Sequence, residues 1–551
     1  MKLIEVNQLH VRFEEEENDV LSNVSFSMDE GESLLLSGPS GCGKSTLTYG
    51  LNGIHPRELD GTMTGDIQFR GHPVENYPPG EMSQHAGVVF QDPESQFCMI
   101  TVEDEVAFGL ENIGTPVEQI SGLIDQALLL VGLEGIKLRA ISTLSGGQKQ
   151  KLALACVLAM EPELLILDEP TANLDPKATR DFIETIEKLQ KDKGFALIVI
   201  EHQLDGWVSF IERGVMMDRS GRIFYDGPIR QGISIHKHTL QEQGIWMPAI
   251  TEYVIEKGWM NQFDHLPLTV DDFLDEWIGK REEVGGSSAT RVDRSSIPIL
   301  ELTSISWMKS DRKIIDDVSL EVREGEFIAI AGANGSGKTS LSRIMSGIQK
   351  PGMGKVSFSG KSLYSWKEID LRQHLGYVFQ NPEHQLITDT VYDEVAFSLR
   401  IQQMGEAEMD KQVRDILSTC QLDGLAHRHP YTLSQGQKRR LSVATMIVDH
   451  QELLILDEPT FGQDAKSTKQ LMDLLDMRCS NGSTIVMITH DMELVDRFAD
   501  RVLVINEGQI VADQHPHRLW ENSNLADWQL DYPVRVKLKH LIEREGLYAP
   551  S

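Results

Sequence analysis

Two short glycine-rich segments of the chain end in a lysine followed by a hydroxyl residue. They are Gly38-Pro39-Ser40-Gly41-Cys42-Gly43-Lys44-Ser45 and Gly332-Ala333-Asn334-Gly335-Ser336-Gly337-Lys338-Thr339. Glycines let successive backbone N–H groups turn toward one point, which suits phosphate groups at the start of a helix. The lysine adds a mobile positive charge, and the Ser45 hydroxyl can bind Mg²⁺. Both segments therefore fit the pattern G-x-x-x-x-G-K-[ST] and predict phosphate-binding loops.

Acidic residues follow two apolar runs, and histidines follow two others. Leu164–Leu167 leads into Asp168-Glu169, and Leu453–Leu456 leads into Asp457-Glu458. We expect each aspartate to support Mg²⁺ and each glutamate to position or deprotonate an attacking water. His202 and His490 end the other two runs, where a histidine can equally be structural. Pro170 and Pro459 stop their strands and hold each glutamate at an edge.

These positions belong to apolar strands that must form a sheet. Leu34–Leu36 and Phe327–Ile330 precede the two loops and have the composition of buried strands. Continuous apolar strands suit a mainly parallel sheet buried on both faces. Ligands bind such sheets at the carboxyl ends of the strands. The sequence therefore predicts an α/β fold with the polar residues gathered at one edge.

The same motifs recur in the same order, so the chain encodes one domain twice. With 551 residues it is also too long for a single core. The predicted parts are a first domain (1–228), a helical extension (229–283), a flexible linker (284–296), a second domain (297–525) and an unassigned tail (526–551).

Composition excludes several classes of function. A formal net charge of −32 repels a phosphate backbone, so we expect no nucleic-acid partner. The five cysteines form no C-x-x-C pair, which argues against a zinc site or a disulfide framework and suits a reducing cytoplasm. We expect no signal peptide and no apolar run of the ~18 residues that a membrane span needs. Work at a membrane would then require a partner.

The segments Leu144-Ser145-Gly146-Gly147-Gln148 and Leu433-Ser434-Gln435-Gly436-Gln437 resemble the signature of ATP-binding-cassette (ABC) ATPases. Together with the loops and the Asp-Glu-Pro strand ends, the resemblance covers nearly the full chain. It implies two tandem P-loop NTPase domains, each with a helical subdomain, which hydrolyse ATP with Mg²⁺. The simpler alternative is an ordinary helix capped by its serine.

By that resemblance, each nucleotide lies between the phosphate loop of one copy and the signature of the other. The implied catalytic residues are Glu169, His202, Glu458 and His490. The implied metal ligands are Ser45, Gln91, Asp168, Thr339, Gln380 and Asp457. The implied nucleotide-binding residues of the first copy are Phe13, Gly38, Ser40, Gly41, Gly43, Lys44, Ser45, Thr46, Gln91, Ser145, Gly147 and Gln148. Those of the second copy are Trp307, Gly332, Asn334, Gly335, Gly337, Lys338, Thr339, Ser340, Gln380, Ser434, Gly436 and Gln437.

Phe13 and Trp307 are included because the family stacks adenine on an aromatic ring at about this distance before the loop. Stacking needs only a flat π face. A core aromatic is the alternative for Phe13. The two copies also differ, since Gln435 stands where the first signature has Gly146. A side chain at this position hinders close approach of the backbone to a phosphate, so the two sites can be unequal.

Two further segments indicate what the ATPase drives. Phe90-Gln91-Asp92-Pro93-Glu94-Ser95-Gln96-Phe97 and Phe379-Gln380-Asn381-Pro382-Glu383-His384-Gln385-Leu386 resemble the ATPases of energy-coupling factor (ECF) importers. That resemblance implies uptake of a vitamin or metal ion at the cytoplasmic face of a prokaryotic membrane. The implied partners are a transmembrane coupling component and a substrate-binding membrane component. Glu94, Gln96 and Phe97, and likewise Glu383, Gln385 and Leu386, are then expected to line grooves for the partner.

Two alternatives belong to other classes of function, and a third lies within the transport class. A double-ABC translation factor would carry a long charged helical linker that reaches RNA, which the Gly/Ser-rich composition of Val284–Thr290 does not match. A DNA-repair ATPase would need inserted zinc modules. A fused ATPase of a sugar importer is the nearest rival, and only the F-Q-[DN]-P-E-x-Q element disfavours it.

Overall fold

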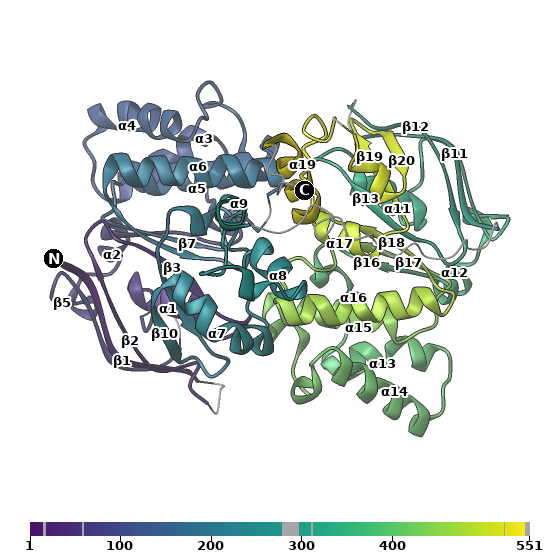
Figure 1. Ribbon diagram of the computed structural model, residues 1–551, viewed down its shortest axis with the longest axis horizontal. Helices are drawn as coiled ribbons and strands as arrows, with labels where there is room; N and C mark the ends of the chain where they lie inside the picture. Colours follow the sequence, from purple (N-terminus) through teal and green to yellow (C-terminus); the bar gives the residue numbers. More distant parts are fainter. Residues whose placement is uncertain are drawn as a thin grey trace. The chain divides into compact units, whose positions relative to one another are not determined.

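The computed structural model describes residues 1–14, 18–57, 60–172, 174–277, 297–309, 312–522 and 524–545. The chain forms two compact units, Met1–Ile278 and Gly279–Ser551 (Figure 1). The predicted linker, 284–296, lies outside the described residues. Each unit is an α/β structure with a mainly parallel sheet, as the apolar strand runs predicted.

The central sheet of the first unit has six strands in the order β10-β9-β3-β8-β7-β6. They are β3 (Ser33–Ser37), β6 (Ala86–Val89), β7 (Leu164–Asp168), β8 (Ala196–Ile200), β9 (Arg213–Met217) and β10 (Ile223–Pro228). All neighbours pair in parallel except β10, which runs antiparallel to β9. The strands that carry the phosphate loop, the carboxylates and the histidine are therefore neighbours.

Alternate residues of these strands bury opposite faces of the sheet. Leu34 and Leu36 pack into one core cluster, together with residues of a second, antiparallel sheet. Leu35 packs into the other cluster, with the helices. The second sheet is ordered β2-β1-β4-β5 and consists of β1 (Lys2–Phe13), β2 (Leu21–Asp29), β4 (Gly61–Phe69) and β5 (His72–Pro73). Burial on both faces explains the continuous apolar runs.

Three helices of the first unit, α3, α4 and α5, gather in a helical subdomain (Figure 1). The helices of this unit are α1 (Lys44–Leu51), α2 (Met82–His85), α3 (Val102–Asn112), α4 (Val117–Leu130), α5 (Gly146–Ala159), α6 (Pro176–Lys193), α7 (Ile229–Gln243), α8 (Ala249–Glu256) and α9 (Val270–Glu276). The last three form the extension. In it Phe263, Phe273 and Trp277 pack ring against ring.

The second unit repeats this topology, with sheet orders β16-β17-β18-β13-β19-β20 and β12-β11-β14-β15. Its strands are β11 (Pro298–Lys309), β12 (Arg312–Arg323), β13 (Phe327–Ala331), β14 (Met353–Phe358), β15 (Lys361–Ser362), β16 (Leu375–Val378), β17 (Leu453–Asp457), β18 (Thr484–Ile488), β19 (Arg501–Asn506) and β20 (Gln509–Gln514). Its helices are α11 (Lys338–Met345), α12 (Glu368–His374), α13 (Val391–Ile401), α14 (Glu406–Thr419), α15 (Gln435–Ile447), α16 (Ala465–Ser480), α17 (Met492–Phe498), α18 (Pro516–Leu519) and α19 (Val534–Glu545).

The tail, which the sequence left unassigned, contains the amphipathic helix α19. Val536 of this helix is buried in the core of the second unit. Arg535 forms an ion pair with Asp496, with Nη2 2.7 Å from Oδ1. The same carboxylate accepts a hydrogen bond from Trp520 Nε1. Helix α19 is therefore an integral element of its unit.

Candidate active sites

In both phosphate loops the lysine ammonium is hydrogen-bonded to backbone carbonyls of its own loop. Nζ of Lys44, which is 5% exposed, donates hydrogen bonds to the carbonyl oxygens of Gly38 (2.9 Å) and Pro39 (3.1 Å). Nζ of Lys338 does the same to Gly332 and Ala333, both at 2.8 Å. In each unit the lysine ammonium and the N-terminus of the helix therefore form a positively charged site that can bind an anion.

Glycine is required at the last loop position. Gly43 has a φ of 97°, and a Cβ atom there would lie 2.7 Å from Leu21 Cδ2. The matching Gly337 has a φ of 111°, and its Cβ would lie 2.8 Å from the carbonyl oxygen of Ile314. The left-handed backbone and the close neighbours together leave no room for a side chain.

In the first unit three predicted residues meet at the carboxyl ends of β6, β7 and β8. Gln91 Nε2 donates a hydrogen bond to Glu169 Oε2 at 2.5 Å, and His202 Nε2 lies 2.9 Å from Glu169 Oε1. Glu169 has a φ of 49°, a backbone strain typical of functional positions. Burial raises the pKa of Glu169, but His202, Lys44 and Gln91 outweigh it and hold the pKa below its ordinary value. The carboxylate is thus kept ionised, as a base for water must be.

The second unit brings the same pair together in a different electrostatic state. Glu458, with a φ of 50°, places Oε1 3.1 Å from His490 Nε2. Burial raises the pKa of Glu458, an effect that Lys338 opposes. Burial and Lys338 lower the pKa of His490. Both shifts favour the uncharged forms, so without nucleotide the two sites differ.

The predicted metal ligands also lie at these edges. Asp168 shares a hydrogen bond with Ser45, and burial together with Glu169 raises its pKa to about 6. Asp457 shares one with Thr339, while its buried Oδ1 has no hydrogen-bond partner among the described residues. A hydroxyl, a carboxylate and an orphaned carboxylate oxygen are donors that fit Mg²⁺. In the first unit a cavity of about 530 Å³ opens beside Ser45, Gln91 and Asp168.

The signature serines cap their helices. Ser145 Oγ accepts a hydrogen bond from the Gln148 backbone N–H at 3.3 Å, and Gln148 Oε1 accepts one from the Ser145 N–H at 3.0 Å. Ser434 and Gln437 form the same reciprocal capping box at the start of α15. The glutamines of both signatures therefore turn back on their own helices. The pairing of each signature with the nucleotide of the other copy stays a prediction.

The two predicted adenine platforms differ. The Phe13 ring stacks on His55, with centroids 5.7 Å apart and planes inclined by 17°. Trp307 is half-buried and packs against the core of the second unit. Both rings lie on the antiparallel sheets, near the ends of β1 and β11. Stacking on a base stays a prediction for each.

The predicted partner grooves are partly wrong. Leu386 is only 5% exposed and belongs to the core, so it cannot anchor a docked helix. Gln385 turns inward and donates hydrogen bonds to the Ser442 carbonyl and Thr445 Oγ1. Gln96 likewise turns to the backbone, at Phe90 N and Val88 O. These glutamines stabilise the turns that follow Gln91 and Gln380. The exposed apolar side chains, Ile100 and Ile387, come later in each segment.

Sequence reasoning missed two buried side chains beside the sites. Arg439, 4% exposed, donates from Nη1 to the Phe379 carbonyl at 2.9 Å, directly before Gln380. The Tyr377 hydroxyl lies 3.4 Å from Asp457 Oδ2. The first copy has Gln150 and Val88 at these positions. A comparison of the two copies, position by position, would have found both.

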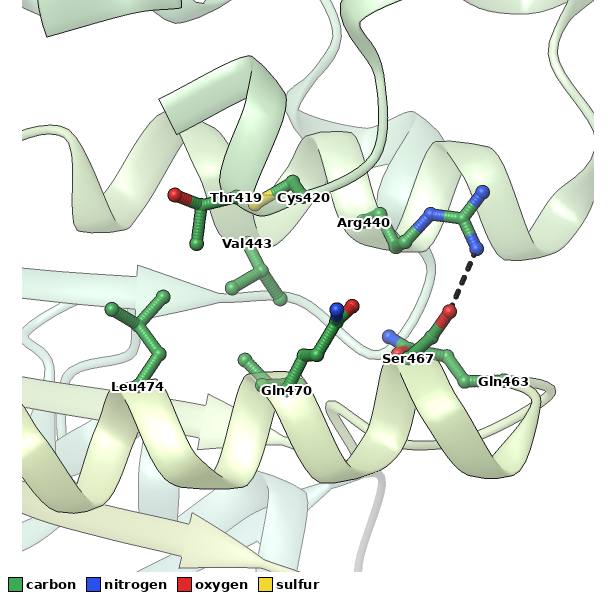
Figure 2. A pocket seen from close by; sticks show the side chains of 9 residues that line it. Thr419, Cys420, Arg440, Val443, Gln463, Ser467, Gln470 and Leu474 are labelled. Atoms are coloured by element: carbon green, nitrogen blue, oxygen red, sulfur yellow. Dashed lines mark hydrogen bonds between the residues drawn. The ribbon is translucent and has the colours of Figure 1, made fainter. Parts of the chain in front are cut away.

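A small cavity between α14, α15 and α16 is a separate feature of the second unit (Figure 2). Arg440 Nη1 donates a hydrogen bond to Ser467 Oγ at 3.0 Å along its wall. Its volume of about 20 Å³ is room for a single water. It is a packing void and no ligand site. Across the described residues no cluster of three His, Cys, Asp or Glu side chains could hold a metal.

Two P-loop units with these strand-end residues define a nucleoside-triphosphate hydrolase with duplicated domains. The family described as "ABC transporter" matches residues 21–172 and 315–461. A curated relative from Bacillus subtilis, "Putative HMP/thiamine import ATP-binding protein YkoD", is 43% identical over 94% of this chain and 92% of its own. A relative from Caldanaerobacter subterraneus subsp. tengcongensis, described only as an ABC transporter ATP-binding protein, is 35% identical over 92% of this chain and 90% of its own.

The chain therefore belongs to the ABC transporter family, as two fused ATP-binding domains that are ATPases. The recognition made from the motifs and the predicted fold class are confirmed. Among solved structures, CbiO1 from Clostridium perfringens, part of the ABC transporter complex CbiONQ, is 31% identical over 45% of this chain and 99% of its own, with a TM-score of 0.38. Within the described residues no helix is both long and apolar enough to cross a bilayer.

Proposed function

We propose that this ATPase energises import of a vitamin-class nutrient through separate transmembrane proteins at the cytoplasmic face of a prokaryotic cell membrane. The observation that carries the proposal is the 43% identity, over nearly all of both chains, to a relative named for HMP/thiamine import. We infer a cargo of that class, a small heterocyclic vitamin or its precursor. The ECF-like segments after Gln91 and Gln380 support this assignment over a sugar importer.

In this proposal Ser45, Gln91 and Asp168 would hold Mg²⁺ in the first site, and Thr339, Gln380 and Asp457 would hold it in the second. When bound, the ion neutralises charge on the phosphates. Lys44 and Lys338 leave their loop carbonyls and pair with the phosphates. Glu169 and Glu458 orient and deprotonate the attacking water, while His202 and His490 hold the glutamates and contact the γ-phosphate.

The surface for the membrane partner is inferred from exposed apolar residues in the matching segments. Ile100 is 78% exposed and Ile387 is 65% exposed, each a few residues after the inward-turned glutamine. Phe108 on α3 and Phe397 on α13 are also exposed, at 37% and 41%. Phe108 and Phe397 occupy matching positions of the two copies, whereas Ile100 and Ile387 lie two positions apart in the repeat. An exposed apolar patch on each unit suits a partner that presents an apolar helix face to each. We propose them in place of the buried Leu386.

Nucleotide trapping tests the assignment of two hydrolysing sites. The double variant Glu169→Gln with Glu458→Gln keeps the shape of both side chains but removes both bases. We expect turnover to fall at least ~100-fold and two ATP molecules to stay bound per chain. Occupancy near one, or turnover close to that of the parent, would contradict the assignment of two hydrolysing sites.

Co-purification tests the role in import. The tagged chain, expressed in cells whose membranes are then solubilised, is expected to retain integral membrane proteins and to stimulate uptake of labelled thiamine or its pyrimidine precursor. Ile100→Asp with Ile387→Asp should abolish that retention, whereas Ile235→Asp, a 68% exposed isoleucine on α7, should not. Co-sedimentation with ribosomes, without membrane proteins, would favour the translation-factor alternative.

A further inference from the structure

A buried carboxylate in the first unit joins two segments that flank the catalytic glutamate. Glu201 is 4% exposed and directly precedes His202 at the end of β8. Its Oε1 accepts hydrogen bonds from Thr171 N (3.0 Å) and Thr171 Oγ1 (2.5 Å). Its Oε2 accepts one from the backbone N–H of His202 at 3.0 Å. One carboxylate thus accepts hydrogen bonds from the loop after β7 and from the backbone of His202.

These contacts surround Glu169 on both sides. Thr171 lies two residues after Glu169 and begins the loop that leads to Asp175, the N-cap of α6. The Glu169 backbone N–H donates to the Ile200 carbonyl at 2.8 Å, directly before Glu201. Inside a protein, where water does not compete, such hydrogen bonds fix geometry closely.

The second unit has no carboxylate at this position. Thr489 replaces Glu201, and its Oγ1 accepts from Asp491 N at 3.1 Å, turned toward its own chain. The loop after β17 is held instead by Gln463, whose Nε2 donates to the Pro459 carbonyl at 2.9 Å. The described residues of the two copies therefore hold the same loop through different hydrogen bonds, and in the first copy these include a bond from the backbone of His202.

We propose that Glu201 is a positioning residue of the first ATP site, whose carboxylate locks the backbone of His202 to Thr171 and so sets the His202–Glu169 contact. Because that contact spans 2.9 Å between Nε2 and Oε1, a displacement of the histidine backbone would break it. The loop and the histidine then move as one piece. This inference rests on the proposed roles of Glu169 and His202.

The test uses the full chain and measures kcat and KM for ATP together with the unfolding temperature. Glu201→Thr introduces the residue of the second copy, and Thr171→Val removes only the hydroxyl. Glu201→Gln keeps an acceptor for Thr171 but turns an amide donor toward the His202 N–H. Glu212→Thr, an exposed glutamate of the same unit, is the matched control.

We expect Glu201→Thr to remove most of the turnover that Glu169→Gln removes, with KM within about twofold, as expected for lost positioning. Glu201→Gln should lower kcat less than Glu201→Thr does, and Glu212→Thr should leave kcat unchanged. In the double variant, Thr171→Val should cause no further loss of kcat beyond that of Glu201→Thr. Full turnover in Glu201→Thr at a temperature where it is folded would overturn the inference. So would a loss that merely follows the unfolding temperature, or additive effects of the two substitutions. If Glu169→Gln itself leaves turnover unchanged, the proposed site fails instead.

Discussion

At the scale of single residues, the two sites contain the same glutamate and histidine but differ in the electrostatic environment of the glutamate. Glu169 and Glu458 both adopt positive φ values, and both lie beside a histidine. In the first unit the pKa of the glutamate is lowered, and in the second it is raised. Despite burial, His202, Lys44 and Gln91 lower the pKa of Glu169, whereas burial raises that of Glu458, with Asp457 adding to the shift and Lys338 and Arg439 opposing it.

The titration of Glu201 gives a pH prediction. Burial raises its pKa from 4.5 to about 7, with Glu169 adding to the shift and Thr171 and His202 opposing it. The folded chain therefore binds a proton that the unfolded chain releases between these values. Wild-type stability from this group is complete at lower pH and is lost as the pH rises through about 7.

Glutamine cannot ionise, so Glu201→Gln lacks this loss. We expect the unfolding temperature of the variant, relative to wild type, to be higher at about pH 8 than at about pH 5. The full shift corresponds to roughly 3 kcal/mol at most, since each pKa unit is about 1.4 kcal/mol. A differential scan of both proteins at the two pH values checks it. A constant difference, or one of opposite sign, would show that Glu201 does not bind the proton.

At the scale of elements, the turn after β16 determines which side chains reach solvent. Gln385 braces the turn from inside, and this places Leu386 in the core and Ile387 outside. Leu386→Ala should therefore destabilise the second unit by roughly 2–5 kcal/mol, because it leaves a cavity. Ile387→Ala should leave the unfolding temperature nearly unchanged. Chemical denaturation of the two adjacent variants makes the comparison, and equal effects would contradict the placement of this turn.

At the scale of the whole molecule, the two copies share one topology but differ in residues near the proposed sites. Gln435 replaces the Gly146 of the first signature, Arg439 replaces Gln150, and Thr489 replaces Glu201. Each pair lies within or beside a proposed site. We therefore expect two ATP sites of different intrinsic rate in one chain.

The single variants Glu169→Gln and Glu458→Gln test this inequality. We expect the steady-state ATPase rates of the two variants to differ by a factor of roughly two or more, since the pKa of the glutamate is lowered in one site and raised in the other. Asp181→Asn on the exposed face of α6 is a control that should leave both rates unaltered. Identical rate constants would mean that the substitutions around the sites compensate.

The sequence by itself determined the motifs, the duplication and the α/β class. Loop glycines, strand-end carboxylates and apolar runs are local patterns, and a phosphate loop such as Gly38–Ser45 needs only its own residues and the helix that follows. The strand ends then converge because parallel neighbours share one edge.

Only the tertiary structure decided which neighbours each site has. Leu386 and Ile387 are both apolar and adjacent, and only the fold of the turn buries one of them. Glu201 reaches Thr171 across 30 residues of sequence because β7 and β8 pair in register, with Asp168 opposite Ile200. The pKa values of Glu169 and Glu458 likewise depend on burial and on charges brought in by other strands. Contacts between distant segments come from packing, which no local pattern encodes.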